Sequence, residues 1–508
     1  MKKYIYIITL LVAAGCNLDT FPSYKYSVDT FWESEEGAEA AMTGCYRSLT
    51  SFALYGIAPL LEETATPNAY NYDNTNAFNQ LATGTQNANT EGVITGRWKS
   101  CYEGIGRCNT HLDRLPQSDL SDKRRAQMEG ETKFLRAIYY SLLVNTYNGV
   151  PLILEEPKTA HGKYARASRE EVVDAIIKDL DDAIDLLDWK WTGAANQGRA
   201  TKGAAMALKA KQLLFEASPL INTTNDPAKW QVAADAAKAL IDSEAQSGYG
   251  LYSNYRDLFL PANEHSIECV FNVEYSKTKN TPANKYNIFC IQFRTNAPLL
   301  DLVLAYERVD GAPNTFPVDY SKLDPRFSAT NFYPGSTFLG KKHATAKEIC
   351  SFTGFAHKKL SIYNEQKRDT DDGNGETNFM VIRYADVLLM YAEAQNEAAS
   401  APSADVYKAI NRVRRRAGMT QFANGSLNKE KMRQAIRHER RIEFAGEGNY
   451  YNDIRRWRTA EIVMNDQIQD YAGTVLAIRS FDPDRDYWWP IPDEQIQLNG
   501  NLEQNPNY

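Results

Sequence analysis

The stretch "IRHERRIEFAGEGNYYNDIRRWR", residues 436–458, decides the fold. It is rich in arginine, yet four acidic residues stand among the arginines at helical spacing: Glu439, Glu443, Glu447 and Asp453. Opposite charges three or four residues apart lie on the same side of a helix and pair there. The pattern therefore favours internal ion pairs on a packed helix over a phosphate-binding surface, and it predicts a helix over 428–460.

Helical periodicity continues outward from this stretch. Capping residues mark three helix starts: Ser34, the capping box from Ser168 to Glu171, and the pair Asp226–Pro227. Further helices are predicted over 97–115, 122–146, 202–217, 380–399 and 404–417. Many inward positions are alanine, which lets helix axes approach closely. We expect a mainly α fold with tetratricopeptide-like helical hairpins, although the sequence has no clean repeat of ~34 residues.

Residues 250–378 break this pattern, because they are rich in Pro, Gly, Asn and aromatic residues. Alternation from Cys269 to Ser276 predicts one strand, and the remainder predicts long loops with short strands. Long loops in a compact protein are usually functional or disordered, and the aromatic content argues against disorder. We expect a helical body over 16–249 and 379–508, with a loop-rich ligand region over about 250–378.

The first residues are typical of a secreted lipoprotein. A basic start precedes an apolar run from Tyr4 to Ala14, which is shorter than the ~20 residues that span a bilayer. The small residues before Cys16 resemble a bacterial lipobox, which predicts a signal peptide over 1–15 and lipidation of Cys16. The alternative is an ordinary export signal with a chance cysteine. Nothing later is apolar enough to span a membrane, so we expect a body tethered by lipid alone.

Charge and motifs exclude several classes of function. The formal net charge of −7 becomes −9 when Lys2 and Lys3 leave with the signal, which argues against nucleic acid. Signatures of metalloproteases, nucleophile elbows, phosphate loops and dinucleotide sites are missing, so we expect no catalytic residue, cofactor or metal. The pair Glu62–Glu63 could be half of a glycosidase site, but the partner carboxylate cannot be identified.

Two further features receive structural interpretations. The run "RDTDDGNGET", 368–377, carries oxygen ligands that suit calcium, but a solvated turn is the favoured interpretation of 369–376. Six cysteines follow Cys16 at irregular spacing, so no disulfide framework is required and buried free thiols are expected. Cys101 and Cys108 would stand ~10 Å apart along one helix, too far to pair.

The positive signal is a pair of loops rich in aromatic and amide residues. They are "TPNAYNYDNTNAFNQ", 66–80, and "NKYNIFCIQFRTN", 284–296. Flat rings offer a stacking platform for sugar C–H faces, while Asn, Asp and Arg supply donors and acceptors for hydroxyls. The predicted ligand-binding residues are Tyr70, Asn71, Tyr72, Asp73, Tyr286, Phe289 and Arg294, with the stretch Phe332–Phe355 as the alternative location.

The chain resembles the SusD/RagB family from residue 16 to 508. The resemblance lies in "FWESEEGAEAAMTGCYRSL", "RWKSCYEGIGRCN", "ETKFLRAIYYSLLVNTYNGVPLI", "GRATKGAAMALKAKQLLFEAS", "RYADVLLMYAEAQNE", "AINRVRRRAGM", "ERRIEFAGEGNYYNDIRRW" and "WPIPDEQIQLNGNLEQNPNY". One departure is Asn505-Pro506-Asn507-Tyr508, where the family often has Asn-Pro-Gly-Tyr. Asn tolerates positive φ better than other non-glycine residues, so the turn can be kept.

The resemblance implies an outer-membrane lipoprotein of Bacteroidota that faces the cell surface. Such proteins have a tetratricopeptide-like helical body and loops that contact ligand. They act as lids on a SusC-like TonB-dependent transporter and bind glycans, or sometimes peptides, without cleaving them. We therefore expect a glycan-import lipoprotein. A peptide-binding lid, a surface glycosidase and a structural scaffold or adhesin remain the alternatives, and the sequence does not name the sugar.

Overall fold

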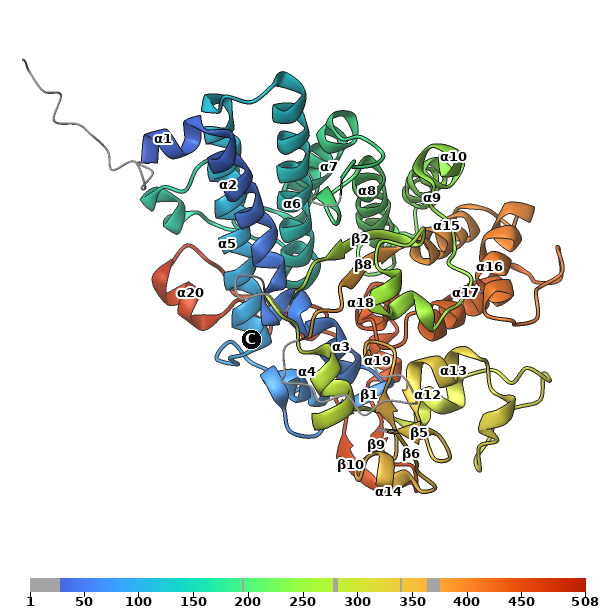
Figure 1. The fold of residues 1–508 in the computed structure, drawn as a ribbon. Coiled ribbons are helices and arrows are strands. Elements are labelled where there is room, and N and C mark those ends of the chain that lie inside the picture. The colour runs from blue at the N-terminus through green and yellow to red at the C-terminus, as the bar shows by residue number, and fades with distance from the viewer. Residues whose placement is uncertain (1–27, 194–195, 277–281, 339, 363–374) are drawn as a thin grey trace, which may run out of the picture.

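A computed structural model describes residues 28–193, 196–276, 282–338, 340–362 and 375–508 (Figure 1). The predicted signal peptide, Cys16 and most of the acidic run 369–376 lie outside these residues. The longer helices are α2 (Glu35–Arg47), α5 (Val93–Arg114), α6 (Asp122–Tyr147), α7 (Arg169–Leu186), α8 (Lys202–Ala217), α9 (Pro227–Asp242), α15 (Tyr384–Ala398), α16 (Ala404–Arg416), α17 (Lys429–Glu443) and α18 (Asn449–Arg456). Along the described part of the chain, every helix is too short or too polar to cross a bilayer.

The helices pack in sequence order, which confirms a mainly α fold. Helix α5 lies against α6, α6 against α7, α7 against α8 and α8 against α9, and α9 then contacts α15 (Figure 1). The predicted caps are present: the Ser34 side chain accepts from the Gly37 N–H, Ser168 and Glu171 form the capping box, and Asp226 caps α9. Buried alanines line the inner side of α8 and α9, where they let the helix axes come close.

Two predicted helices were wrong in part. The range 380–399 begins with a strand, β8 (Phe379–Arg383), which pairs antiparallel with β2 (Cys269–Val273) before α15 starts. The range 428–460 is two helices, α17 and α18, separated at Phe444–Gly448. The chain turns there because Gly446 and Gly448 adopt φ of 84° and 80°, a left-handed conformation that ends a helix.

The break places the charges of 436–458 in two buried networks, which we together call the ion-pair core. Arg383 donates to Glu268, Glu443 and Glu447 at 2.6, 2.9 and 2.7 Å. Burial alone would raise the pKa of Glu443, but the guanidinium groups of Arg416 and Arg383 hold that pKa far below its usual range. The ion-pair core comprises Glu268, Arg326, Lys359, Arg383, Asp386, Glu393, Arg416, Glu439, Arg440, Glu443, Glu447, Asp453 and Arg456. The predicted internal ion pairs are confirmed.

In the described residues between β2 and β8, the helices and strands are all short. They are α11 (Tyr286–Ile288), β3 (Asn296–Pro298), α12 (Leu300–Ala305), α13 (Arg326–Thr330), β4 (Asn331–Phe332), β5 (Thr337–Phe338), β6 (Lys341–Lys342), α14 (Ala346–Ile349) and β7 (Ala356–His357). Elsewhere the short elements are α1 (Val28–Glu33), α3 (Ala58–Glu62), β1 (Ala69–Asn71), α4 (Phe78–Thr83), α10 (Glu244–Ser247), α19 (Ala460–Val463), β9 (Gln467–Gln469), β10 (Val475–Ile478) and α20 (Asp493–Leu498). Strands β1, β5, β6, β9 and β10 gather at the lower end of the molecule in Figure 1.

The cysteines and the C-terminal turn agree with the sequence. The six cysteines of the described residues are free thiols, and all but Cys269 are buried. Asn507 adopts φ of 66°, so it takes the left-handed conformation that glycine adopts most readily. The turn is therefore kept despite the substitution.

Candidate functional site

The two predicted aromatic–amide loops meet in the structure, although they are far apart in the sequence. Strand β1 pairs antiparallel with β3, with Tyr70 opposite Ala297 and Asn71 opposite Asn296. The backbone N–H of Tyr72 extends this pairing by donating to the carbonyl of Thr295 at 3.1 Å. The loops 66–80 and 284–296 thus form one continuous surface.

The alternative stretch, Phe332–Phe355, joins the same surface. The rings of Tyr72 and Phe352 stack with centroids 3.6 Å apart and planes 16° apart. The Arg294 guanidinium lies 5.2 Å from the centre of the Phe338 ring and donates to the carbonyl of Ile349. The two locations that the sequence offered as alternatives are therefore one place in the fold.

The hairpin formed by β9 and β10 packs against this surface, although the sequence did not indicate a role for it. Ile468 of β9 packs with Tyr70 and Leu299 in a small apolar cluster. Tyr471, at the hairpin turn, covers Gly354, where an added Cβ would lie 2.7 Å from the tyrosine ring. The hairpin carries no aromatic–amide cluster of its own, so composition gave no signal for its role.

The seven predicted ligand-binding residues divide by exposure. Asp73 is exposed, and Tyr72 and Arg294 are half-buried. Four are buried: Tyr70, Asn71, Tyr286 and Phe289. The structure therefore leaves three of the seven with a face to solvent, and the other four hold the loops in place.

The buried residues have internal partners. The Tyr286 hydroxyl donates to the carbonyl of Tyr55 at 2.7 Å, and its ring stacks on Phe379 at 5.2 Å. The Asn71 amide donates to the carbonyl of Thr75 at 3.1 Å, which closes the turn of the first loop. Contacts with Tyr55 and Phe379 come from distant segments, so nothing local in the sequence reveals that Tyr286 points inward.

Two exposed rings complete the surface. Phe293 is 47 % exposed and Phe352 is 39 % exposed, and neither was among the named residues. The Phe293 carbonyl accepts from the Tyr72 hydroxyl at 3.5 Å, so the two residues are neighbours. We call Tyr72, Asp73, Phe293, Arg294 and Phe352 the loop surface.

The polar groups of the loop surface suit a neutral, hydroxylated ligand. Asp73 accepts from the N–H and hydroxyl of Thr75 at 3.1 and 2.5 Å, and its carboxylate faces solvent. Burial raises the pKa of Tyr72 above that of a free phenol, so its hydroxyl stays a donor at neutral pH. A carboxylate acceptor, a guanidinium donor and a phenol thus border the stacked rings.

Glu62 and Glu63 are directed into the interior and not toward the loop surface. Glu62 forms a buried ion pair with Arg97. Glu63 accepts from the Asn68 amide and the Gly448 N–H, each at 2.8 Å, and burial raises its pKa to about 7. Within the described ranges, no group of three or more His, Cys, Asp or Glu side chains is placed to hold a metal ion.

Comparison with known proteins gives a consistent family. A model described as "SusD family" matches residues 231–508, and one described as "Starch-binding associating with outer membrane" matches residues 30–214. The SusD-like protein P25 of Formosa agariphila is 25% identical, over 97% of this chain and 96% of that protein.

Solved structures share the fold. A SusD-like carbohydrate binding protein from Bacteroides fragilis superimposes with a TM-score of 0.82 at 25% identity, over 93% of this chain and 100% of that one. A laminarin binding SusD-like protein superimposes with a TM-score of 0.70 at 23% identity, over 94% of this chain and 100% of that one. These likenesses extend over the helices and the loop-rich segment together.

Proposed function

Since the chain belongs to the SusD family, we propose that it is a cell-surface lipoprotein that captures a glycan on the loop surface and delivers it to a SusC-like TonB-dependent transporter. The name of the Bacteroides fragilis relative supports carbohydrate as the ligand, and the description of the second family model supports association with the outer membrane. Delivery, the lipid anchor and the transporter belong to the proposal alone.

The stacked pair Tyr72–Phe352 carries the ligand proposal. Two rings joined from separate loops form a rigid platform that loses little conformational entropy when a ligand binds. Asp73 and Arg294 stand beside it as acceptor and donor. Loops held by a rigid helical body are also where binding residues usually sit.

The test is titration of a glycan panel against Tyr72→Ala and Phe352→Ala. Loss of one stacking ring should weaken binding by roughly 1–3 kcal/mol, by analogy with base–aromatic stacking, which is about 5- to 150-fold in Kd. Phe316→Ala is the matched control, because that ring is 61 % exposed on a different loop. Unchanged affinity in both folded variants would remove the ligand from the loop surface.

The same measurements separate the alternatives. Saturable binding of peptides with no binding of any glycan would favour a peptide-binding lid. Release of reducing ends from a bound polysaccharide would make the protein a glycosidase. Absence of any saturable ligand would favour a scaffold or adhesin.

The anchor and the partner are tested in cells. Cys16→Ser should move the protein out of the membrane fraction or leave an uncleaved precursor, because the lipid would be lost. Mild detergent should recover the wild-type protein with a large β-barrel transporter, since a permanent complex typically buries roughly 2,000 Å² or more. Normal processing with unchanged membrane attachment in Cys16→Ser would refute the anchor. Consistent recovery as a lone monomer would refute the transporter.

A further inference from the structure

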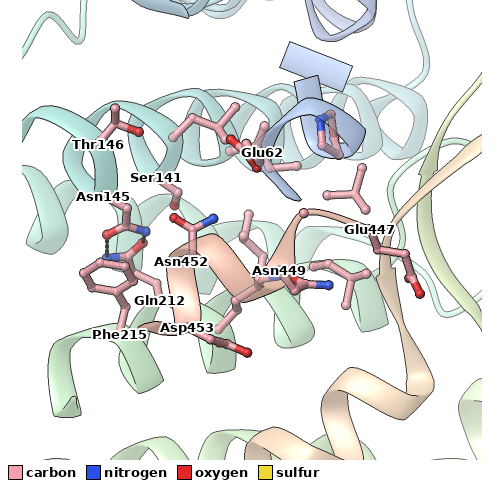
Figure 2. Close-up of a pocket in the computed structure, with 18 of the residues that line it drawn as sticks. Glu62, Ser141, Asn145, Thr146, Gln212, Phe215, Glu447, Asn449, Asn452 and Asp453 are labelled. Atoms are coloured by element: carbon pink, nitrogen blue, oxygen red, sulfur yellow. Dashed lines mark hydrogen bonds between the residues drawn. The ribbon is translucent and has the colours of Figure 1, made fainter. Parts of the chain in front are cut away.

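A cavity of about 130 Å³ lies inside the helical body, away from the loop surface (Figure 2). Its walls come from α6, α8 and α18, with contributions from α3 and β8. The function proposed above makes no use of this space.

One wall of the cavity is polar and incompletely paired. Ser141 of α6 is 7 % exposed, and its hydroxyl has no hydrogen-bond partner among the described residues. Figure 2 shows Asn452 of α18 directed toward Ser141 across the cavity. Asn452 is half-buried; its side-chain oxygen accepts from Arg455 at 3.4 Å, and its amide nitrogen makes no hydrogen bond within the described residues. Buried polar groups are normally paired, so the Ser141 hydroxyl calls for a polar occupant.

The neighbouring polar side chains form hydrogen bonds with each other along the cavity wall and leave the cavity itself open. Asn145 and Gln212 bond to each other at 3.0 Å, as the dashed lines in Figure 2 show. The side-chain oxygen of the half-buried Asn449 accepts from Lys211 at 3.0 Å. The cavity therefore offers the buried hydroxyl of Ser141, with the Asn452 side chain directed toward it.

The charges around the cavity are paired with each other. Glu62 pairs with Arg97, and Lys211 donates to Asp386 at 3.1 Å. Asp453 accepts from Arg440 at 2.9 Å. An ion in the cavity would have to compete with these pairs, so the site suits an uncharged molecule.

Apolar side chains complete the lining, and the space is small. They include the rings of Tyr55, Phe379 and Phe215 and several aliphatic side chains. Since one water occupies roughly 30 Å³ of liquid volume, the cavity holds about four water-sized groups. That is the size of a small polyol, whose carbons would face the rings and whose hydroxyls would face the amides.

We propose that this cavity binds a small neutral polyol, with Ser141 and Asn452 as its hydrogen-bonding partners. The polyol hydroxyls accept from Asn452 and exchange hydrogen bonds with Ser141, while the carbon chain lies against Tyr55 and Phe379. This site is separate from the loop surface and does not depend on glycan import. Its affinity is expected in the millimolar range, because so small a molecule has few atoms with which to bind.

Erythritol is the probe, and saturation-transfer NMR on the intact protein is the measurement. The wild-type signal should saturate with erythritol concentration. Ser141→Ala and Asn452→Leu should each weaken binding by about fivefold or more, since each removes hydrogen-bonding atoms from the cavity wall. Ser48→Ala is the matched control, because Ser48 is 6 % exposed and lies outside the cavity.

A crystal structure with erythritol completes the test. It should show erythritol in contact with Ser141 and Asn452. Only ordered water in the cavity, an unsaturable signal, or equal binding in the wild type and both variants would overturn the proposal. Circular dichroism establishes folding, and if Ser141→Ala does not fold, Asn452→Leu decides, because Asn452 is half-buried and tolerates exchange better.

Discussion

The ion-pair core and the loop surface use polar side chains in opposite ways. In the ion-pair core, charged groups such as Arg383 and Glu443 are fully buried, and each is paired with several opposite charges. On the loop surface, rings and short polar groups such as Phe352 and Asp73 keep exposed area. Buried charged groups that form ion pairs with each other specify a fold. Exposed aromatic rings and polar groups that face solvent are free to contact a ligand.

This difference between the ion-pair core and the loop surface explains why members of a family share a fold more closely than they share a ligand. The stretch 436–458 supplies Glu439, Glu443 and Glu447 to the ion-pair core, and it is one of the blocks that carry the family resemblance. The loop surface is made from segments outside those blocks. Family membership therefore fixes the architecture of this chain more firmly than its ligand.

Of the predicted changes, removal of a charge from the ion-pair core should lower the free energy of unfolding most. Arg383→Met removes the cation that faces Glu268, Glu443 and Glu447, and leaves buried carboxylates with fewer partners. Removal of one partner of a buried pair costs about 3–5 kcal/mol of unfolding free energy. Urea unfolding followed by circular dichroism should show that loss, or the variant should fail to accumulate as folded protein.

The matched control is Lys238→Met, which breaks a surface pair with Asp242 at 2.7 Å. Exposed pairs contribute little, so its unfolding midpoint should remain close to that of the wild type. Equal midpoints for Arg383→Met and the wild type would show that the ion-pair core does not specify the fold.

Local patterns predicted much of the helical body. Capping residues placed the starts of α2, α7 and α9, because a cap is satisfied within a few residues of chain. Longer-range effects were missed. The apolar run at 379–382 suits either a helix or a strand, and only its pairing with β2 makes it part of β8. The break at Phe444–Gly448 depends on two left-handed glycines within a continuous helical pattern.

The sequence predicted which types of residue make up the candidate site, but not which of their side chains face solvent. Composition selected both loops, and β1 and β3 do bring them together. Which rings face solvent is decided by distant partners: Phe379 and Tyr55 cover Tyr286, whereas Phe352 stacks on Tyr72 from the side. These partners are far away in the sequence, so no local pattern encodes them.

Glu63 connects the two regions and should give an intermediate, pH-dependent effect. It accepts from Gly448, in the stretch 436–458, and from Asn68, in the loop 66–80. Burial raises its pKa in the folded state to about 7. The charges of Lys359 and Glu447 lower and raise it, respectively. The unfolded chain loses this proton near pH 4.3, so between about pH 4.3 and 7 only the folded state holds it.

The sign follows from linkage. The contribution of Glu63 to stability is present below about pH 4.3, falls as pH rises to 7, and is constant above. The total change is at most roughly 4 kcal/mol. Glu63→Gln cannot titrate, so the difference in unfolding free energy between wild type and variant should vary across this window. Parallel urea midpoints from pH 4.5 to 8 would contradict the raised pKa.

The smallest effect should come from within the candidate site, at the boundary between buried and exposed residues. Tyr286→Phe removes the hydroxyl that donates to the Tyr55 carbonyl and keeps the ring on Phe379. One neutral hydrogen bond is worth about 0.5–1.5 kcal/mol, so urea unfolding should show a small loss of stability. Glycan affinity should not change, because Tyr286 is 1 % exposed and supports the loop surface without facing it. Tyr72→Phe is the matched comparison, since Tyr72 carries the same hydroxyl on the loop surface. Weaker glycan binding by Tyr286→Phe, with Tyr72→Phe unaffected, would place the ligand beneath the loops and reverse the assignment of these two tyrosines.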